Sequence, residues 1–285
     1  MSIIDNRTGW IIRITISLFF STFVNAQNVI TFEKTPIKPL FLQLDNSNVS
    51  TYRSTFVNDD HEKYLTLIQL ATFLYLEYGI EHHTTNNRTS TPNKLDSYFR
   101  DKIRWGTTTK DDAESASDML LYGVFIGTMP IIPLFSDNGY FNMLRTSLDV
   151  ISLNGIITDL VKMSVKRQRP DSYYKTREDT DDSFRSFFSG HTSTTFAIGT
   201  SNAIMLSELY PDKKNLIWIG NLSLAAATGY LRIAGDKHYI SDVICGGLVG
   251  YSIARMVHKR KEMKRVNIGL GSVADHFSID LSIRL

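Results

Sequence analysis

The chain has one cysteine among its 285 residues and little excess charge of either sign. Without a second cysteine no intrachain disulfide can form, so an apolar core has to hold the fold together. Cys245 lies in an apolar helical stretch, where a buried, unreactive thiol is expected. The 31 Lys and Arg residues oppose 29 Asp and Glu residues, for a net charge of +2. This balance excludes the basic field of a nucleic-acid-binding protein, and any phosphate-binding charge has to be local.

Long hydrophobic runs are also lacking. A helix that spans a bilayer takes about 20 apolar residues, and the apolar segments here are interrupted by polar residues such as Glu77, Asn221 and Asp242. The mean hydropathy is −0.12, whereas several spanning helices would make it clearly positive. We therefore expect a soluble or peripheral exported domain, with a membrane-associated body as the alternative.

Residues 1–26 have the pattern of a secretory signal peptide. Arg7 and Arg13 supply a positive amino-terminal region, and Ile14–Val24 is an apolar stretch too short to span a bilayer. The small residue Ala26 favours cleavage before Gln27. The sequence thus predicts export to the periplasm, and the alternative is an uncleaved membrane anchor.

Apolar and aromatic residues are plentiful. The chain is 42% hydrophobic, with 16 Phe and 13 Tyr, which is enough for a packed core. Four segments are expected: the signal peptide at 1–26, an N-terminal extension with one apolar helix and a polar linker at 27–106, a helical domain at 107–260, and a tail at 261–285.

Apolar residues at helical spacing predict an all-α bundle. The predicted helices cover Lys63–Ile80, Ser117–Phe135, Phe141–Lys166, Ser193–Tyr210, Leu216–Tyr230 and Tyr239–Val257. Ser117 or Asp118 is expected to cap the second helix, and Pro130 and Pro133 to bend or end it.

The tail changes period. Apolar residues alternate with polar ones or glycine over Val266–Leu270 and again over Phe277–Leu285, with a Gly- and Asp-containing link at Gly271–His276. Alternation on both sides of such a link predicts a small β-hairpin.

The first block that can carry chemistry is Lys162-Met-Ser-Val-Lys-Arg-Gln-Arg169-Pro170. On a helix, Lys162 and Arg169 would share one face, and two cations that point the same way can bind a dianion. Arg169 would then lie at the end of the helix before Pro170, where a cation suits the helix dipole. Taken alone, a solvated basic helix end is the better interpretation, since Lys166 and Arg167 lie there too.

The second block is Ser189-Gly190-His191, just ahead of an apolar run. This pattern is typical of a helix N-terminus, whose free N–H groups favour an anion. Gly190 would let the backbone approach an oxygen closely, and His191 would stand where it can exchange a proton with an ester oxygen. Taken alone, an ordinary Ser cap beside a histidine is the better interpretation.

The third block runs from Arg232 through His238 to Asp242. His238 and Asp242 are four residues apart, so on one helix their side chains can meet. A carboxylate on one imidazole nitrogen fixes the tautomer and leaves the other nitrogen as a nucleophile. A structural His–Asp pair is an equally good interpretation of this block alone.

Together, the blocks resemble the signature of the type-2 phosphatidic acid phosphatase family, the superfamily of bacterial acid phosphatases, lipid phosphatases and vanadium haloperoxidases. That signature reads Lys, six residues, Arg-Pro; then Pro-Ser-Gly-His; then Ser-Arg, five residues, His, three residues, Asp. The matching residues are Lys162, Arg169, Pro170, Ser189, Gly190, His191, Arg232, His238 and Asp242. Phe188 replaces the proline before Ser189, and Leu231 replaces the serine before Arg232, which predicts an altered rate or pocket shape.

The resemblance implies a helical bundle of the acid phosphatase and haloperoxidase type and a metal-independent phosphatase without a cofactor. His238 would attack phosphorus, oriented by Asp242, and His191 would protonate the leaving oxygen. The implied phosphate-binding residues are Lys162, Arg169, Ser189, Gly190 and Arg232.

The implied substrate is a phosphorylated lipid, a polyprenyl diphosphate or a small phosphomonoester. A lipid substrate would bring the protein into contact with a membrane surface. The oligomeric state stays open. In the loop between the first two blocks, Tyr173, Tyr174 and Phe184 would contact an apolar substrate group, and Glu178–Asp182 would repel highly anionic substrates; a merely solvated loop is the alternative. Two other functions remain open: a vanadate-dependent haloperoxidase-like enzyme, and a non-catalytic phosphate- or lipid-binding relative.

Overall fold

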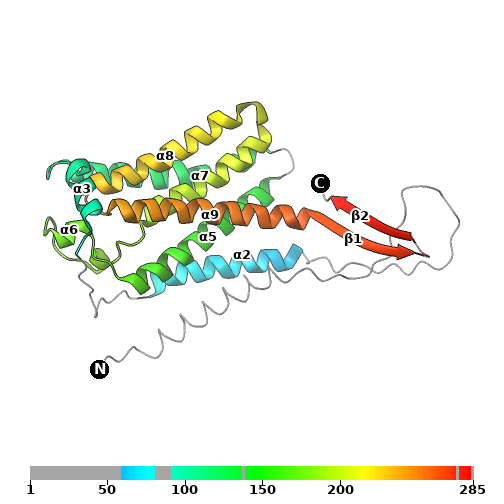
Figure 1. Cartoon of the computed structure of the whole chain (residues 1–285), viewed down its shortest axis with the longest axis horizontal. Coiled ribbons are helices and arrows are strands. Elements are labelled where there is room, and N and C mark those ends of the chain that lie inside the picture. The colour runs from blue at the N-terminus through cyan, green and yellow to red at the C-terminus, as the bar shows by residue number, and fades with distance from the viewer. Residues whose placement is uncertain (1–58, 81–90, 137–138, 274–275, 284–285) are drawn as a thin grey trace, which may run out of the picture. The chain divides into compact units, whose positions relative to one another are not determined.

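The computed structural model describes residues 59–80, 91–136, 139–273 and 276–283 (Figure 1). The chain forms two compact units, one of Val57–Arg260 and one that combines Met1–Phe56 with Lys261–Leu285. The predicted signal peptide lies outside the described residues, so it stays a prediction, as do the predicted domain boundaries.

The described part of the first unit is helical, as the sequence predicts. Its α-helices are α2 (Asp59–Leu74), α3 (Lys94–Ile103), α4 (Lys110–Asp118), α5 (Tyr140–Val165), α6 (Pro170–Tyr173), α7 (Gly190–Leu209), α8 (Lys214–Ala234) and α9 (Ile240–Arg265), the last of which runs on into the second unit. Two π-helical turns, η1 (Tyr75–Gly79) and η2 (Met119–Ile126), continue α2 and α4, and three short 3₁₀ helices are η3 (Ile132–Phe135), η4 (Asp181–Phe184) and η5 (Pro211–Lys213).

The bundle is centred on α7. This helix packs against α5 and α8, and α2 lies along α5 (Figure 1). Helix α4 packs against α8. Phe125 of η2, Met129 after it, Ile198 of α7 and Ala225 of α8 form a buried apolar cluster. Burial of such side chains is the main favourable term in folding, about 1.5–3 kcal/mol for each large one.

Two glycines bring α9 into backbone contact with α7. A Cβ on Gly246 would lie 2.7 Å from the carbonyl oxygen of Ser189, and one on Gly250 would lie 2.0 Å from that of Ser193. No larger residue fits this approach without moving a helix. As a result, the first turn of α9 meets the start of α7, where the N–H of Ser189 donates to the carbonyl of Asp242 at 3.1 Å.

The segment around Asp118 differs from its prediction. A helix begins at Lys110 and runs through Asp118 into η2, so neither Ser117 nor Asp118 is an N-terminal cap. The polar stretch ahead of them, Lys110–Ala116, is itself helical, so the helix has already begun before it reaches Ser117. The helix does end before Pro130, as predicted.

The second unit is described for the end of α9 and for two strands. Strand β1 (Val266–Val273) pairs antiparallel with β2 (His276–Ile283), from Val266 opposite Ile283 to Val273 opposite His276. A pair of strands alone is marginally stable, so we expect these strands to dock on other residues of the chain. That docking stays a prediction.

Two helices are long and apolar enough to cross a membrane, Pro211–Ala234 and Ile240–Glu262. Only 28% and 39% of their most apolar windows are buried in the protein. Their exposed apolar side chains are Leu216, Ile219, Leu224, Tyr230, Ile244, Leu248 and Tyr251. These surfaces favour the predicted alternative, membrane association, over a fully soluble body.

Candidate active site

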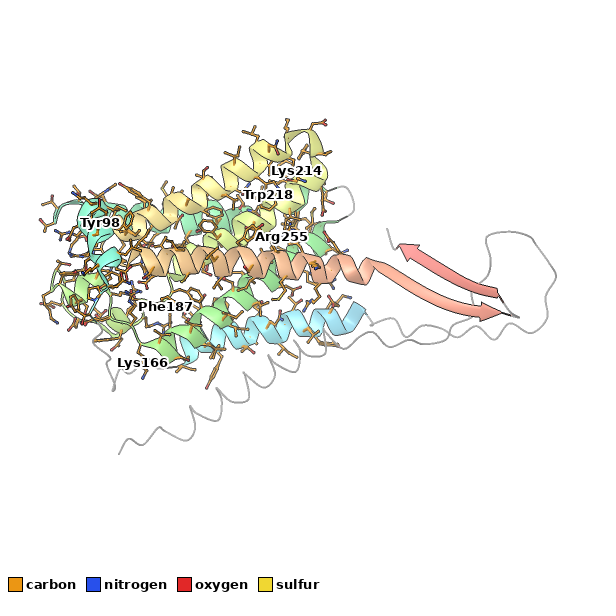
Figure 2. All side chains as sticks on the ribbon, in the orientation of Figure 1. Tyr98, Lys166, Phe187, Lys214, Trp218 and Arg255 are labelled. Carbon is orange, nitrogen blue, oxygen red and sulfur yellow. The ribbon has the colours of Figure 1, made fainter. Side chains whose placement is uncertain are left out.

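The three blocks meet at one end of the helical unit. The last turns of α5 and α8 and the first turns of α6, α7 and α9 all lie at this end (Figure 1). Phe187 is at the same end, whereas Lys214, at the start of α8, is at the opposite end (Figure 2). The topology therefore places residues from five helices in one region.

His238 lies in the turn between α8 and α9 and is 1% exposed. Its Nδ1 is 2.8 Å from the carbonyl oxygen of Ser186. Because a carbonyl can only accept a hydrogen bond, Nδ1 carries the proton, and Nε2 keeps its lone pair. The nitrogen that a nucleophile needs is thus left unprotonated.

The expected direct bond between His238 and Asp242 is absent. His238 precedes α9, so the two residues do not share a helix, and Nδ1 is 3.7 Å from Oδ2 of Asp242. That Oδ2 instead accepts from the Ser186 hydroxyl at 2.6 Å and from the Tyr239 N–H at 3.0 Å. Asp242 therefore reaches the imidazole through Ser186, whose hydroxyl it binds and whose carbonyl holds Nδ1.

A partly buried arginine, Arg167, neutralises Asp242. Nη1 of Arg167 binds Oδ1 of Asp242, and Nη2 binds Oδ2 of Asp96 at 2.6 Å. Asp96, from α3, also accepts from the backbone N–H and the hydroxyl of Ser241 in the first turn of α9. Both carboxylates are fully buried, and a buried charge needs such pairing to be tolerated.

Lys162 and Arg169 do not share a helix face, in contrast to the prediction. Helix α5 ends at Val165 because Lys166 adopts a left-handed conformation with φ of 49°. Arg169 is extended, and Pro170 begins α6 rather than ending α5. The guanidinium of Arg169 binds the side chain of Asp182 at 2.6 Å.

The helix N-terminus predicted at the second block is confirmed. Ser189 is the N-cap of α7, and its side chain accepts from the N–H of Thr192. A Cβ on Gly190 would lie 3.1 Å from Nζ of Lys162. The glycine therefore leaves room for an ammonium group at the positive end of α7, where a bound anion would be favourable.

His191 pairs with a carboxylate that the three blocks do not contain. Its Nε2 is 2.7 Å from Oδ1 of Asp118, and the same oxygen is 3.4 Å from Nη1 of Arg232. Arg232 also donates to the hydroxyl of Ser117 at 3.0 Å.

Burial and neighbouring cations together lower the pKa of three groups in this region. Burial, followed by Arg169, Arg232, Lys162 and His191, lowers the pKa of His238 well below 6.5. Burial and Arg232 lower the pKa of His191 to about 4. Burial and Arg169 lower the pKa of Lys162 to about 8. Each of these lowered pKa values has a cationic neighbour among its causes. Such a concentration of positive charge favours binding of an anion.

The loop between the first two blocks does not present the aromatic side chains as expected. Phe184 is buried, and the ring of Tyr174 lies 3.6 Å below the guanidinium carbon of Arg100. Asp182, from the acidic cluster, is paired with Arg169, although its own side chain is 55% exposed.

Metal ligands do not cluster in the part of the chain that the structure describes. No group of three or more His, Cys, Asp or Glu side chains there is arranged to hold a metal ion. Cys245 is half-buried, whereas the sequence predicts a buried thiol.

Sequence reasoning missed the roles of four residues of this region: Asp96, Asp118, Arg167 and Ser186. In local sequence, Arg167 has the pattern of a solvated basic helix end, and Asp118 that of a helix cap. Local sequence gave no signal for Ser186 or Asp96, whose contacts with Asp242 and Arg167 join residues 56 and 71 positions apart.

Comparison with known proteins supports the family resemblance that the three blocks predict. Residues 146–265 match the sequence model of the PAP2 superfamily. A lipid A 1-phosphatase of Porphyromonas gingivalis is 29% identical over 106 residues, which cover 37% of this chain and 21% of the relative. The match thus spans about a fifth of that relative's length.

Two solved structures resemble the chain. A transmembrane PAP2-type phosphatidylglycerolphosphate phosphatase from Bacillus subtilis matches 70% of this chain and 97% of its own, with 20% identity and a TM-score of 0.49. LpxE of Aquifex aeolicus matches 60% of this chain and 99% of its own, with 20% identity and a TM-score of 0.47. The predicted resemblance is confirmed by the sequence match: the helical segment 146–265, which contains all three blocks, matches the PAP2 superfamily.

Proposed function

We propose that this chain is a metal-independent phosphatase that acts on a phosphorylated lipid through a phosphohistidine at His238. The observation that carries the proposal is the hydrogen bond from Nδ1 of His238 to the Ser186 carbonyl, which leaves Nε2 unprotonated. Lys162, Arg169 and Arg232, whose charges all act on this imidazole, would neutralise the phosphate oxygens.

The reaction has two proposed steps. Nε2 of His238 forms a bond to phosphorus as the ester P–O bond breaks, and the leaving oxygen takes a proton from His191. Water then attacks the phosphohistidine and gives a proton back to His191, which releases inorganic phosphate and restores His238. The Ser189 hydroxyl and the Gly190 N–H would complete the phosphate cradle, and the cations replace a metal ion in stabilising the transition state.

An apolar leaving group fits the surroundings of His191. The ring of Tyr122 stands edge-on at 6.2 Å from the imidazole and is 61% exposed, and Met119, on the same turn, is 68% exposed. Exposed apolar side chains beside the proton donor suit a substrate whose leaving group carries hydrocarbon. The relative named as a lipid A 1-phosphatase points to the same substrate class.

Phosphate release from phosphatidic acid in detergent micelles, glycerol phosphate and nitrophenyl phosphate, in excess EDTA, tests the proposal. We expect turnover of all three substrates, with the highest kcat/KM for phosphatidic acid. His238→Ala should reduce every rate by about 10³-fold or more.

A matched control is His258→Ala, because His258 lies on α9 and contacts Ser201 away from the three blocks. This variant should retain the parent rate. Full inhibition by EDTA, or turnover that survives in His238→Ala, would contradict the proposal, and a preference for glycerol phosphate would contradict the lipid assignment.

A further inference from the structure

Asp118 contacts two residues of the site although it belongs to none of the three blocks. Its Oδ1 is 2.7 Å from Nε2 of His191 and 3.4 Å from Nη1 of Arg232. An ionised carboxylate can only accept hydrogen bonds, so Nε2 of His191 carries the proton of this contact. The nitrogen that Asp118 binds is therefore the one whose N–H the protonated imidazole would give to the leaving oxygen in the proposed reaction.

The position of Asp118 exposes its carboxylate to incoming substrate. It is the last residue of α4, directly before the π-helical turn η2, and π-turns inserted in helices frequently occur at functional sites. The side chain of Asp118 is 43% exposed and that of His191 is 23% exposed. The pair is thus accessible from solvent, in contrast to the fully buried His238 and Asp242.

We propose that Asp118 is a positioning residue for His191: it holds the Nε2–H in the phosphate site and keeps the imidazole protonated for transfer to the leaving oxygen. This inference rests on the proposed function. A single oxygen of Asp118 touches both the proposed proton donor and a cradle guanidinium, as an oxygen of a bound phosphate ester would. On substrate binding, the ester oxygen shares this N–H with Oδ1 and receives the proton as the P–O bond breaks and the bond between phosphorus and Nε2 of His238 forms.

The charges around His191 explain why a carboxylate is needed there. Burial has the largest effect against the protonated imidazole, and Arg232 from α8 and Lys162 from α5 add to it. Asp118 opposes them and acts to raise the pKa of His191. In return, the hydrogen bond from His191 is the largest influence on the pKa of Asp118, which is lowered.

Asp118→Asn tests the inference, because Asn keeps the size and the acceptor oxygen but removes the charge. The pKa that governs the alkaline limb of kcat/KM should fall by about one unit or more. The loss of kcat should be larger for an alkyl phosphate than for nitrophenyl phosphate, since a poor leaving group depends more on a proton donor. Asp112→Asn, an exposed residue of the same helix, should leave both quantities unchanged.

An equal loss on both substrates with an unshifted limb would overturn the inference. NMR titration of the His191 imidazole gives a readout that needs no turnover, and its pKa should fall in Asp118→Asn but not in Asp112→Asn. If the parent hydrolyses phosphate esters and this pKa does not change in Asp118→Asn, the role of Asp118 is wrong while the proposed phosphatase function stands. If the parent hydrolyses none and the pKa does fall, the pairing is supported and the proposed reaction fails.

Discussion

At the scale of single residues, burial and neighbouring cations set the protonation of the two site histidines. His238 has to be neutral to attack phosphorus, and its lowered pKa keeps it neutral well below pH 6.5. His191 has to be protonated to serve as a donor, and burial and Arg232 lower its pKa to about 4. The two requirements overlap only in the acid range.

The pH profile of kcat/KM follows from these two groups, because that ratio reports the pKa values of the free enzyme. We expect its maximum on the acid side, with a fall as the pH rises above about 4, where His191 loses its proton between Asp118, Arg232 and Lys162. In kcat, the same limb should lie at higher pH, because bound phosphate stabilises the imidazolium. Steady-state kinetics across the pH range measure both limbs, and a kcat/KM that rises towards neutral pH would contradict this order.

At the scale of helices, the site depends on the close contact between α7 and α9. Gly246 and Gly250 allow it, and the contact sets the position of Ser189 relative to Asp242. The cap at Ser189 and most helices could be predicted from sequence, since a cap and an apolar face are local signals. The end of α5 could not, because the left-handed Lys166 is a non-glycine residue with positive φ, for which the sequence has no marker.

Gly250→Ala should destabilise the protein by about 1–3 kcal/mol, because the added Cβ would lie 2.0 Å from the Ser193 carbonyl oxygen. The midpoint of denaturant unfolding measures this loss. Gly220→Ala is the matched control on α8, where a Cβ would meet nothing within 4 Å. It should be neutral or stabilising by up to about 1 kcal/mol, since alanine favours a helix. Equal effects of both substitutions would contradict the proposed packing role.

At the scale of the whole molecule, sequence and structure differ in the surface of the helical unit that they indicate. Interrupted apolar runs and a mean hydropathy of −0.12 suggested a soluble body. The polar residues that interrupt these runs are partly internal, such as Asp242, which is fully buried, whereas Leu216 and Leu248 are 71% and 63% exposed. Average hydropathy does not tell which side of a helix faces outward. The exposed apolar faces of α8 and α9 therefore could not be predicted from it.

Membrane association has a direct test. We expect the expressed chain to sediment with membranes and to stay there in high salt and in alkaline carbonate, because apolar faces of α8 and α9 would contact lipid. Detergent should release it. Release by salt alone would indicate a peripheral, electrostatic contact and would contradict a role for these two helices.

The central claim is that His238 carries the phosphate during turnover, and trapping the intermediate tests it most directly. Enzyme mixed with substrate labelled on the phosphorus and quenched in alkali, where phosphohistidine survives, should retain label on the peptide that contains His238. His238→Ala should retain none, and His258→Ala should label like the parent. Label on another residue, or rapid turnover with no trapped label in the parent, would contradict the account.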